Sequence, residues 1–217
     1  SDCLAAHLKS RLPTATRLTL GLRGLGKTSR GTATTVVENL YRAGAIRRDG
    51  VVTPVPAAWK TKQIDLGRGP VTTVLVPWGD VSTAYYSTGI PNIEVYMALP
   101  ALLRRLMVLS RGLGWLVWAP AVQGFLKRLV QALASGPTEA ERARGVSLLW
   151  GEVKDDAGNC VSSRMQTPEG YALTALTAVG MAQKVLAGCA PVGFQTPSRA
   201  YGADFILEFE GVVRSDE

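Results

Sequence analysis

The chain has 217 residues, of which 47% are hydrophobic and 19% are charged. This balance is typical of a folded globular protein and excludes an intrinsically disordered one, and a chain of this length can bury a sizeable core without disulfide bonds. The formal net charge is +7, but no more than two basic residues are adjacent anywhere in the sequence. We therefore expect no nucleic-acid binding.

The cysteine and histidine content argues against a metal site. The three cysteines lie far apart and His7 is the single histidine, so the usual zinc ligands are lacking. We expect Cys3 and Cys189 to be small buried residues in a reducing compartment rather than nucleophiles. The sequence opens without a secretory signal, and its most apolar stretch, 113–126, is too short to span a bilayer, so a cytoplasmic location is predicted. The opening on Ser1 suggests that the sequence continues upstream.

The hydrophobic periodicity predicts an α+β fold. Hydrophobic residues three and four apart indicate helices, and strict alternation of hydrophobic and polar residues indicates strands. In chain order, the sequence predicts a helix ending at residue 11, a strand (16–22), a helix (30–43), three strands (51–56, 62–66 and 71–76), a helix (81–87), a strand (92–97), two helices (102–111 and 113–134), a short helix from 138, two strands (145–153 and 160–167), a helix (168–188) and a strand (204–209). We expect a single domain over residues 1–217, with a mixed, mostly antiparallel sheet covered by helices.

Short polar motifs predict where several of these elements begin or reverse. Thr138 and Glu141 have the spacing of a capping box at the start of a short helix. The turn-forming residues 155–159 predict a long hairpin between their flanking strands, and residues 47–50 predict another reversal that ends in Asp-Gly. Asp80 is expected to cap the helix that follows it.

Residues 21–28 match the P-loop pattern G-x-x-x-x-G-K-[ST], after a predicted strand and before a predicted helix. The residues that would contact phosphate or magnesium are Gly21, Gly26, Lys27 and Thr28. The strand ending in Asp that such a fold needs is lacking, because its nearest candidate, 74–80, is interrupted by a proline. Ser29 also has the character of a helix cap, which places the helix start beyond the lysine. A P-loop nucleotide-binding protein is therefore the alternative function, not the preferred one.

The two predicted helices within 102–133 allow two interpretations. They are amphipathic, basic and contain tryptophan, as in helices that lie on a membrane surface or bind a partner protein. They could equally form a hairpin that covers the sheet, and we favour this interpretation because most amphipathic helices face a core. The later helix, 168–188, is apolar on every side, so we expect both of its faces to be covered.

Residues 77–96 form the centre of the chain. Prolines and glycines turn the backbone repeatedly, and the stretch carries Trp78, Tyr85, Tyr86 and Tyr96, whose large rings need both an apolar neighbour and a hydrogen-bond partner. A strand, a helix and a strand follow one another here through short connections. We expect the polar groups of this stretch to face a surface that another part of the protein covers.

Five stretches together resemble the saccharopine-dehydrogenase-like oxidoreductases, a group that includes proteins described as trans-acting enoyl reductases. These stretches are Trp78–Asp80, Tyr85–Tyr86, Gly89–Tyr96, Thr167–Thr174 and Gly193–Leu207. The resemblance implies a homodimeric enzyme with an N-terminal Rossmann domain that binds NAD(P) and a second α+β domain that shapes the pocket for a small-molecule substrate. This sequence resembles the second domain, with residues 168–217 as a segment that returns to pack on the Rossmann domain.

The sequence departs from that family in lacking the G-x-G-x-x-G pattern after an N-terminal strand. The family's NAD(P) site therefore cannot be assigned to it, and we expect this chain to bind no cofactor and to be inactive alone. The polar residues at turns and helix starts are the candidates for lining the substrate pocket: Trp78, Asp80, Tyr85, Tyr86, Asn92, Thr167, Glu169 and Tyr171. The last three lie at a helix N-terminus, with Thr167 as its expected cap, where free backbone amides favour an anion. No catalytic residue is predicted.

Overall fold

The computed structural model describes residues 1–24, 27–39 and 44–217. The helices are α1 (Asp2–Arg11), α2 (Arg30–Asn39), α3 (Asp80–Thr88), α4 (Ala101–Trp118), α5 (Pro120–Leu133), α6 (Glu139–Arg144), α7 (Gly170–Leu186) and α8 (Pro197–Tyr201), with a 3-10 helix η1 at Phe205–Glu208. The strands are β1 (Arg17–Gly24), β2 (Gly44–Arg48), β3 (Val51–Val55), β4 (Thr61–Asp65), β5 (Pro70–Leu75), β6 (Asn92–Ala98), β7 (Val146–Lys154), β8 (Cys160–Pro168) and β9 (Val213–Asp216).

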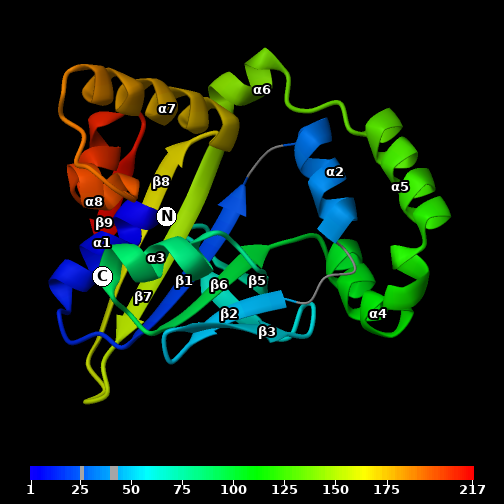
Figure 1. Ribbon diagram of the computed structural model, residues 1–217, viewed down its shortest axis with the longest axis horizontal. Helices are drawn as coiled ribbons and strands as arrows, with labels where there is room; N and C mark the ends of the chain where they lie inside the picture. The colour runs from blue at the N-terminus through cyan, green and yellow to red at the C-terminus, as the bar shows by residue number, and fades with distance from the viewer. Residues whose placement is uncertain (25–26, 40–43) are drawn as a thin grey trace.

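The strands form one mixed sheet in the order β3-β2-β6-β1-β7-β8-β9 (Figure 1). The hairpin of β4 and β5 joins this sheet through pairing of β5 with the last residues of β6. β1 and β6 are parallel, and the other pairs among the described residues are antiparallel. The predicted α+β fold, with a mixed and mostly antiparallel sheet, is therefore confirmed.

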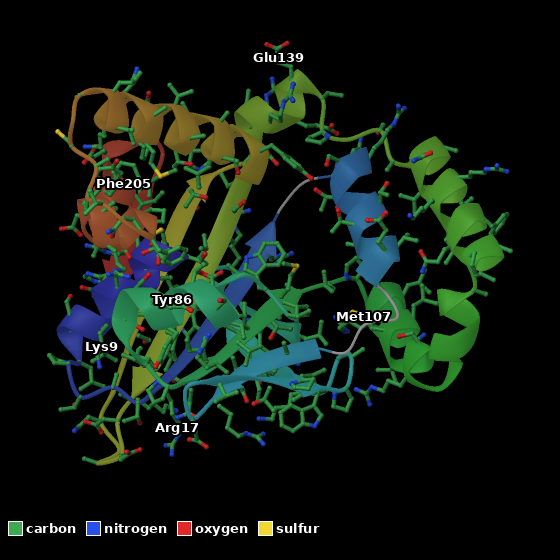
Figure 2. All side chains as sticks on the ribbon, viewed as in Figure 1. Lys9, Arg17, Tyr86, Met107, Glu139 and Phe205 are labelled. Carbon is green, nitrogen blue, oxygen red and sulfur yellow. The ribbon has the colours of Figure 1, made fainter. Side chains whose placement is uncertain are left out.

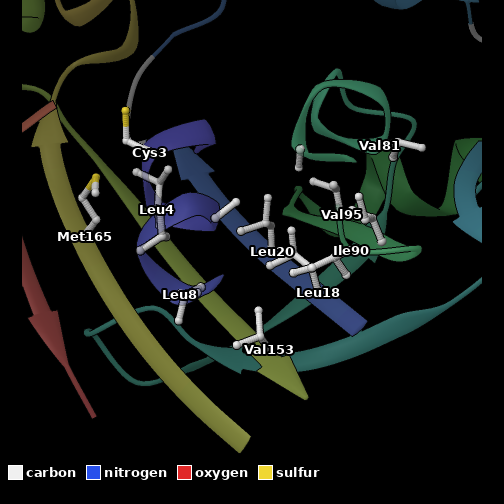
Figure 3. Packing of buried hydrophobic residues seen from close by; sticks show 14 of the residues in the cluster. Cys3, Leu4, Leu8, Leu18, Leu20, Val81, Ile90, Val95, Val153 and Met165 are labelled. Carbon is white, nitrogen blue, oxygen red and sulfur yellow. The ribbon is translucent and has the colours of Figure 1, made fainter. Parts of the chain in front are cut away.

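The sheet buries side chains on both faces because its central strands alternate between two apolar sets. Leu18 and Leu20 of β1 face α1 and α3, and the fully buried Leu4 and Leu8 of α1 pack against them (Figure 3). A second, smaller cluster lies on the opposite face, where the β4–β5 hairpin covers the sheet. Its buried members are Ile46, Val55, Ile64, Leu66, Leu75, Tyr96, Leu148 and Trp150.

Two sequence predictions about strands need correction. Residues 47 and 48 belong to β2, and the reversal itself lies at Asp49 and Gly50, which both have positive φ, as in the turns that favour tight hairpins. The predicted strand 204–209 is wrong, because η1 occupies Phe205–Glu208 and the last strand is β9, at the edge of the sheet. The helix predicted at 30–43 is confirmed as far as Asn39, and residues 40–43 lie outside the described residues.

Several predictions about burial are also corrected. Leu176, Val179 and Leu186 of α7 are exposed, so this helix is not covered on both faces as we expected, and Cys189 is exposed as well. The helices α4 and α5 do not form a hairpin over the sheet. They lie beside the sheet, and α5 packs against α2 (Figure 1).

Candidate functional site

A cavity of about 560 Å³ lies beyond the C-terminal end of β1. It lies between the first turn of α2, the loop from α5 to α6, and the first turn of α7. Eight residues line it: Ser29, Arg30, Gly31, Ser135, Gly136, Pro137, Arg142 and Tyr171. Figure 2 shows that Glu139, on the same short helix as Arg142, points outward from the molecule. The cavity therefore combines segments from three distant parts of the sequence.

The N-terminus of α2 supplies one wall of the cavity. Ser29 caps this helix, because its hydroxyl oxygen accepts a hydrogen bond from the Thr32 amide at 3.2 Å. The amides of Arg30 and Gly31, at the first two helical positions, have no carbonyl one turn earlier to donate to. Helix N-termini carry a partial positive charge, so this wall favours an anion.

Tyr171 joins the start of α7 to the start of α2. Its hydroxyl oxygen accepts a hydrogen bond from the Ser29 amide at 2.8 Å and lies 2.9 Å from the Thr32 hydroxyl. Burial raises the pKa of Tyr171, but these hydrogen bonds stabilise the phenolate more strongly, so the pKa is lowered overall. The hydroxyl is therefore held as an acceptor at the edge of the cavity.

Glu169 sets the position of Tyr171. Its carboxylate caps α7 by accepting hydrogen bonds from the amides of Tyr171 and Ala172 at 2.9 and 3.1 Å. This corrects the prediction that Thr167 caps the helix: Thr167 is a buried residue of β8, and its hydroxyl donates to the Pro168 carbonyl. The cap lies two residues later than the sequence suggested, because β8 continues through the proline.

The charged residues around the cavity are mainly basic. Arg30 donates through Nε to the Ala134 carbonyl at 2.9 Å, which leaves its charge uncompensated, and Arg142 lines the wall on α6. Within the described part of the chain, no carboxylate lines the cavity. Guanidinium groups bind carboxylates and phosphates through charged hydrogen bonds. The cavity is therefore suited to a small anion or to the anionic group of a larger ligand.

The nearby carboxylate of Glu141 does not line the cavity and is bound by partners of its own. Its pKa is lowered to about 2, first by the hydrogen bond from the Thr138 amide and then by Lys27, whose Nζ lies 2.9 Å away. Thr138 and Glu141 form the predicted capping box at the start of α6. The Lys27–Glu141 ion pair links the segment before α2 to α6.

The P-loop residues do not have the geometry of a phosphate loop. Gly21 lies inside β1, where it is paired with both Tyr96 and Trp150. Lys27 and Thr28 precede the helix instead of opening it, and Gly26 lies outside the described residues. In a P-loop the chain between the first glycine and the lysine wraps around the phosphates, whereas here β1 continues to Gly24. This arrangement does not favour the alternative function.

The predicted pocket residues on and before α3 lie away from the cavity. Trp78 is exposed in the turn after β5, and Asp80 is buried in the first turn of α3, one position after the actual N-cap, Gly79. The Arg47 guanidinium lies 4.2 Å from the centre of the Tyr85 ring. The ring of Tyr86 packs edge-on against Phe194 at 5.1 Å. These contacts give α3 a role in packing.

Asn92 connects two neighbouring segments through its side-chain amide, at the end of the sheet away from the cavity. Its amide oxygen accepts a hydrogen bond from the Asp49 amide at 3.0 Å, and its amide nitrogen donates to the Thr16 carbonyl at 3.2 Å. Asn92 pairs with Arg17 at the start of β1, whereas the cavity lies beyond Gly24 at the end of that strand. Of the predicted pocket residues, the structure thus brings Tyr171 to the cavity, with Glu169 as the cap that positions it, and leaves the central-stretch candidates elsewhere.

Sequence reasoning did not assign Ser29, Arg30 or Arg142 to a binding site. Ser29 was recognised only as a helix cap, and nothing in the local sequence distinguishes Arg142 from its neighbours on α6. Both arginines reach the cavity through long-range packing. The described residues contain no cluster of three or more potential metal ligands among His, Cys, Asp and Glu.

Comparisons with known proteins support the fold. No family model matches the sequence, and no curated protein matches it either. Among solved structures, the chain is similar to apo histidine-tagged saccharopine dehydrogenase (L-Glu forming) from Saccharomyces cerevisiae, with a TM-score of 0.55 and 10% sequence identity. The similarity covers 100% of this chain and 71% of that one. The chain therefore has a distant saccharopine-dehydrogenase-like fold.

Proposed function

We propose that the chain is the substrate-binding and dimerisation domain of a saccharopine-dehydrogenase-like oxidoreductase that uses NAD(P) in the cytoplasm. The observation that carries the proposal is the structural similarity to saccharopine dehydrogenase over the whole chain. The basic cavity supports it, because it offers a place for the anionic group of a small-molecule substrate. In such enzymes the cofactor supplies the redox chemistry, and the protein binds and orients the substrate.

The end of β1 does not have the arrangement of a Rossmann dinucleotide site. A Rossmann site needs a glycine-rich turn that opens directly into a helix, next to parallel strands. Here Gly21 is paired within β1, and β7, one of the two neighbours of β1, is antiparallel. A side chain at Gly21 would also meet Ile64 and Leu66, because a Cβ there would lie 3.1 and 3.3 Å from them. The proposal therefore places NAD(P) on a separate Rossmann domain.

The exposed side of residues 168–217 supports contact with such a domain. Apolar side chains on α7 and in the following loop are open to solvent: Leu176, Val179, Val185, Leu186, Val192 and Phe194. Exposed apolar side chains of this kind are available to pack on a partner domain. In the proposal, this segment packs on the Rossmann domain and closes the substrate pocket.

The coding sequence upstream of Ser1 and a cofactor-binding measurement test the proposal together. We expect a βαβ unit with G-x-G-x-x-G upstream in the same reading frame. The longer polypeptide should enhance the fluorescence of NADPH or NADH, whereas the 217-residue chain should not. An initiator codon directly before Ser1, or dinucleotide binding by the 217-residue chain, would contradict the proposal.

The cavity is tested separately by calorimetric titration of the 217-residue chain with L-glutamate and with inorganic phosphate. We expect binding of at least one anion, and Arg142→Gln should weaken it roughly tenfold, the effect of losing one charged hydrogen bond. Arg144→Gln is the matched control, because Arg144 lies on the same helix but does not line the cavity. Equal effects of the two substitutions, or no binding by the parent chain, would remove the cavity from the proposal without affecting the argument from the fold.

A further inference from the structure

Helices α4 and α5 form an arm at one side of the molecule, far from α7 and α8 (Figure 1). We call residues 101–133 the α4–α5 arm. The sequence contains no acidic residue between Glu94 and Glu139, whereas the whole chain has 17. The basic residues of the arm are Arg104, Arg105, Arg111, Lys127 and Arg128. All the charged residues of the arm are therefore basic.

The outer side of α4 is apolar. Met107 packs against the main core and Ser110 is buried, so these residues define the inner side of the helix. Leu102, Leu106 and Leu109 are 69%, 45% and 58% exposed. Their spacing of four and three residues places them in one row along the helix. This row is open to solvent over the first half of α4.

The outer side of α5 has the same character. Its inner side packs on α2, where the Lys127 ammonium lies 2.6 Å from the Glu38 carboxylate. Phe125 and Leu129 are exposed and lie four residues apart, so they share the outer side with Arg128. An exposed aromatic ring and an exposed leucine next to an arginine are typical of helices that lie in a lipid interface.

The positive charge of the arm is largely uncompensated. Arg104 donates to the Leu99 carbonyl, and Arg111 donates to the Ala57 and Ala58 carbonyls. Hydrogen bonds to carbonyl groups leave the guanidinium charge in place. Among the described residues, Lys127 is the basic residue of the arm that forms an ion pair. The arm therefore attracts a negatively charged surface.

We infer that the α4–α5 arm binds the surface of anionic lipid membranes, with the outer leucines and Phe125 inserted between head groups. The charge favours lipid over a second copy of this chain, because a symmetric dimer through this side would bring arginines against arginines. In the described residues, no helix is long and apolar enough to cross a membrane, so the arm would lie in the interface. This inference does not depend on the proposed enzymatic role.

Co-sedimentation of the 217-residue chain with lipid vesicles tests the inference. We expect binding to vesicles of phosphatidylcholine mixed with phosphatidylserine, much weaker binding to phosphatidylcholine alone, and release by added salt because exposed charges are screened. Phe125→Ser combined with Leu129→Ser should weaken binding roughly tenfold or more, since two apolar side chains no longer leave water. Arg105→Gln combined with Arg128→Gln should reduce the preference for phosphatidylserine.

The matched control is Leu186→Ser combined with Val192→Ser, which removes two exposed apolar side chains far from the arm. The control should bind vesicles as the parent does, and circular dichroism should show that all variants are folded. Equal binding to both vesicle types, or equal loss in arm and control variants, would overturn the inference. The absence of lipid binding would also overturn it. If ultracentrifugation then shows a dimer that Phe125→Ser combined with Leu129→Ser dissociates, the apolar side of the arm binds a second copy of the chain instead of lipid.

Discussion

At the scale of single residues, Gly151 determines how closely α1 approaches the sheet. A Cβ at this position of β7 would lie 2.5 Å from Leu8 Cδ1 and 3.2 Å from Leu20 Cδ2, inside normal contact distances. Both leucines are at most 1% exposed and packed in the main core, so they have little room to move. Glycine is therefore required here for steric reasons.

We expect Gly151→Ala to lower the free energy of unfolding by about 1–3 kcal/mol, the usual cost of overpacking a core. Urea denaturation followed by tryptophan fluorescence measures this change. Gly24→Ala is the control, because no atom outside the adjoining residues lies within 4 Å of a Cβ built there. If both variants unfold at the same urea concentration, α1 has more freedom on the sheet than the structure indicates.

Glu169 is a second residue whose role can be isolated. It is buried, and its carboxylate accepts the two hydrogen bonds that open α7. We expect Glu169→Ala to cost about 1–2 kcal/mol of stability, measured by thermal unfolding, because the loss of a helix cap leaves backbone amides unpaired. Glu139→Ala is the comparison, since Glu139 is in the first turn of α6 outside its capping box and should cost a few tenths of a kcal/mol. Similar losses in the two variants would argue against the cap.

At the scale of elements, β9 joins the end of the chain to its beginning. Asp216 of β9 accepts a hydrogen bond from the Ser163 hydroxyl at 2.7 Å, and its Oδ1 lies 2.8 Å from His7 Nε2 and 3.2 Å from the Arg11 guanidinium. The Ser163 hydrogen bond, followed by the contact with His7, lowers the pKa of Asp216 below its ordinary value of 3.8.

This lowered pKa makes the contribution of Asp216 dependent on pH. The ionised carboxylate stabilises the folded state above about pH 4, and the stabilisation is lost as the pH falls through the lower, folded-state pKa. We expect Asp216→Asn to unfold at a lower temperature than the parent at pH 7. The loss in free energy of unfolding should be less than about 1 kcal/mol, because the site is largely exposed. Calorimetry at a series of pH values should show the difference shrinking below pH 4. If the stability difference between parent and variant stays constant with pH, its cause is not the charge of Asp216.

The elements that the sequence predicted correctly are those with local signals. The hairpin around 155–159 and the capping box of Thr138 and Glu141 depend on residues a few positions apart, and both are present. The errors arose where distant contacts decide. Arg47 looked like part of a polar turn, but it is buried in β2, where it donates to the carbonyls of Val81 and Gly50. The apolar residues of η1 have the alternation of a strand, although the rings of Phe205 and Phe209 meet edge to face across this turn.

At the scale of the whole molecule, the fold class was predictable and the candidate site was only partly so. The periodicity identified seven of the described strands but missed β2 and β9, and the resemblance to saccharopine dehydrogenases agrees with the similarity in structure. Tyr171 was among the expected pocket residues, but its partner Ser29 is far away in sequence. That pairing depends on β7 aligning the end of β1 with the end of β8, through Gly24 with Ser147 and Val146 with Pro168. A single sequence does not reveal such a register.

The position of β1 also has a consequence for how the chain folds. Arg17 lies between Asn92 and Lys154, so the middle of the sheet joins segments from the first, second and third quarters of the chain. Loops of this length must close before the central contacts form, which slows folding to milliseconds or longer. During synthesis, β1 leaves the ribosome long before either of its neighbours. Its unpaired edges are then open to other chains, so newly made protein should depend on chaperones more than its modest size suggests.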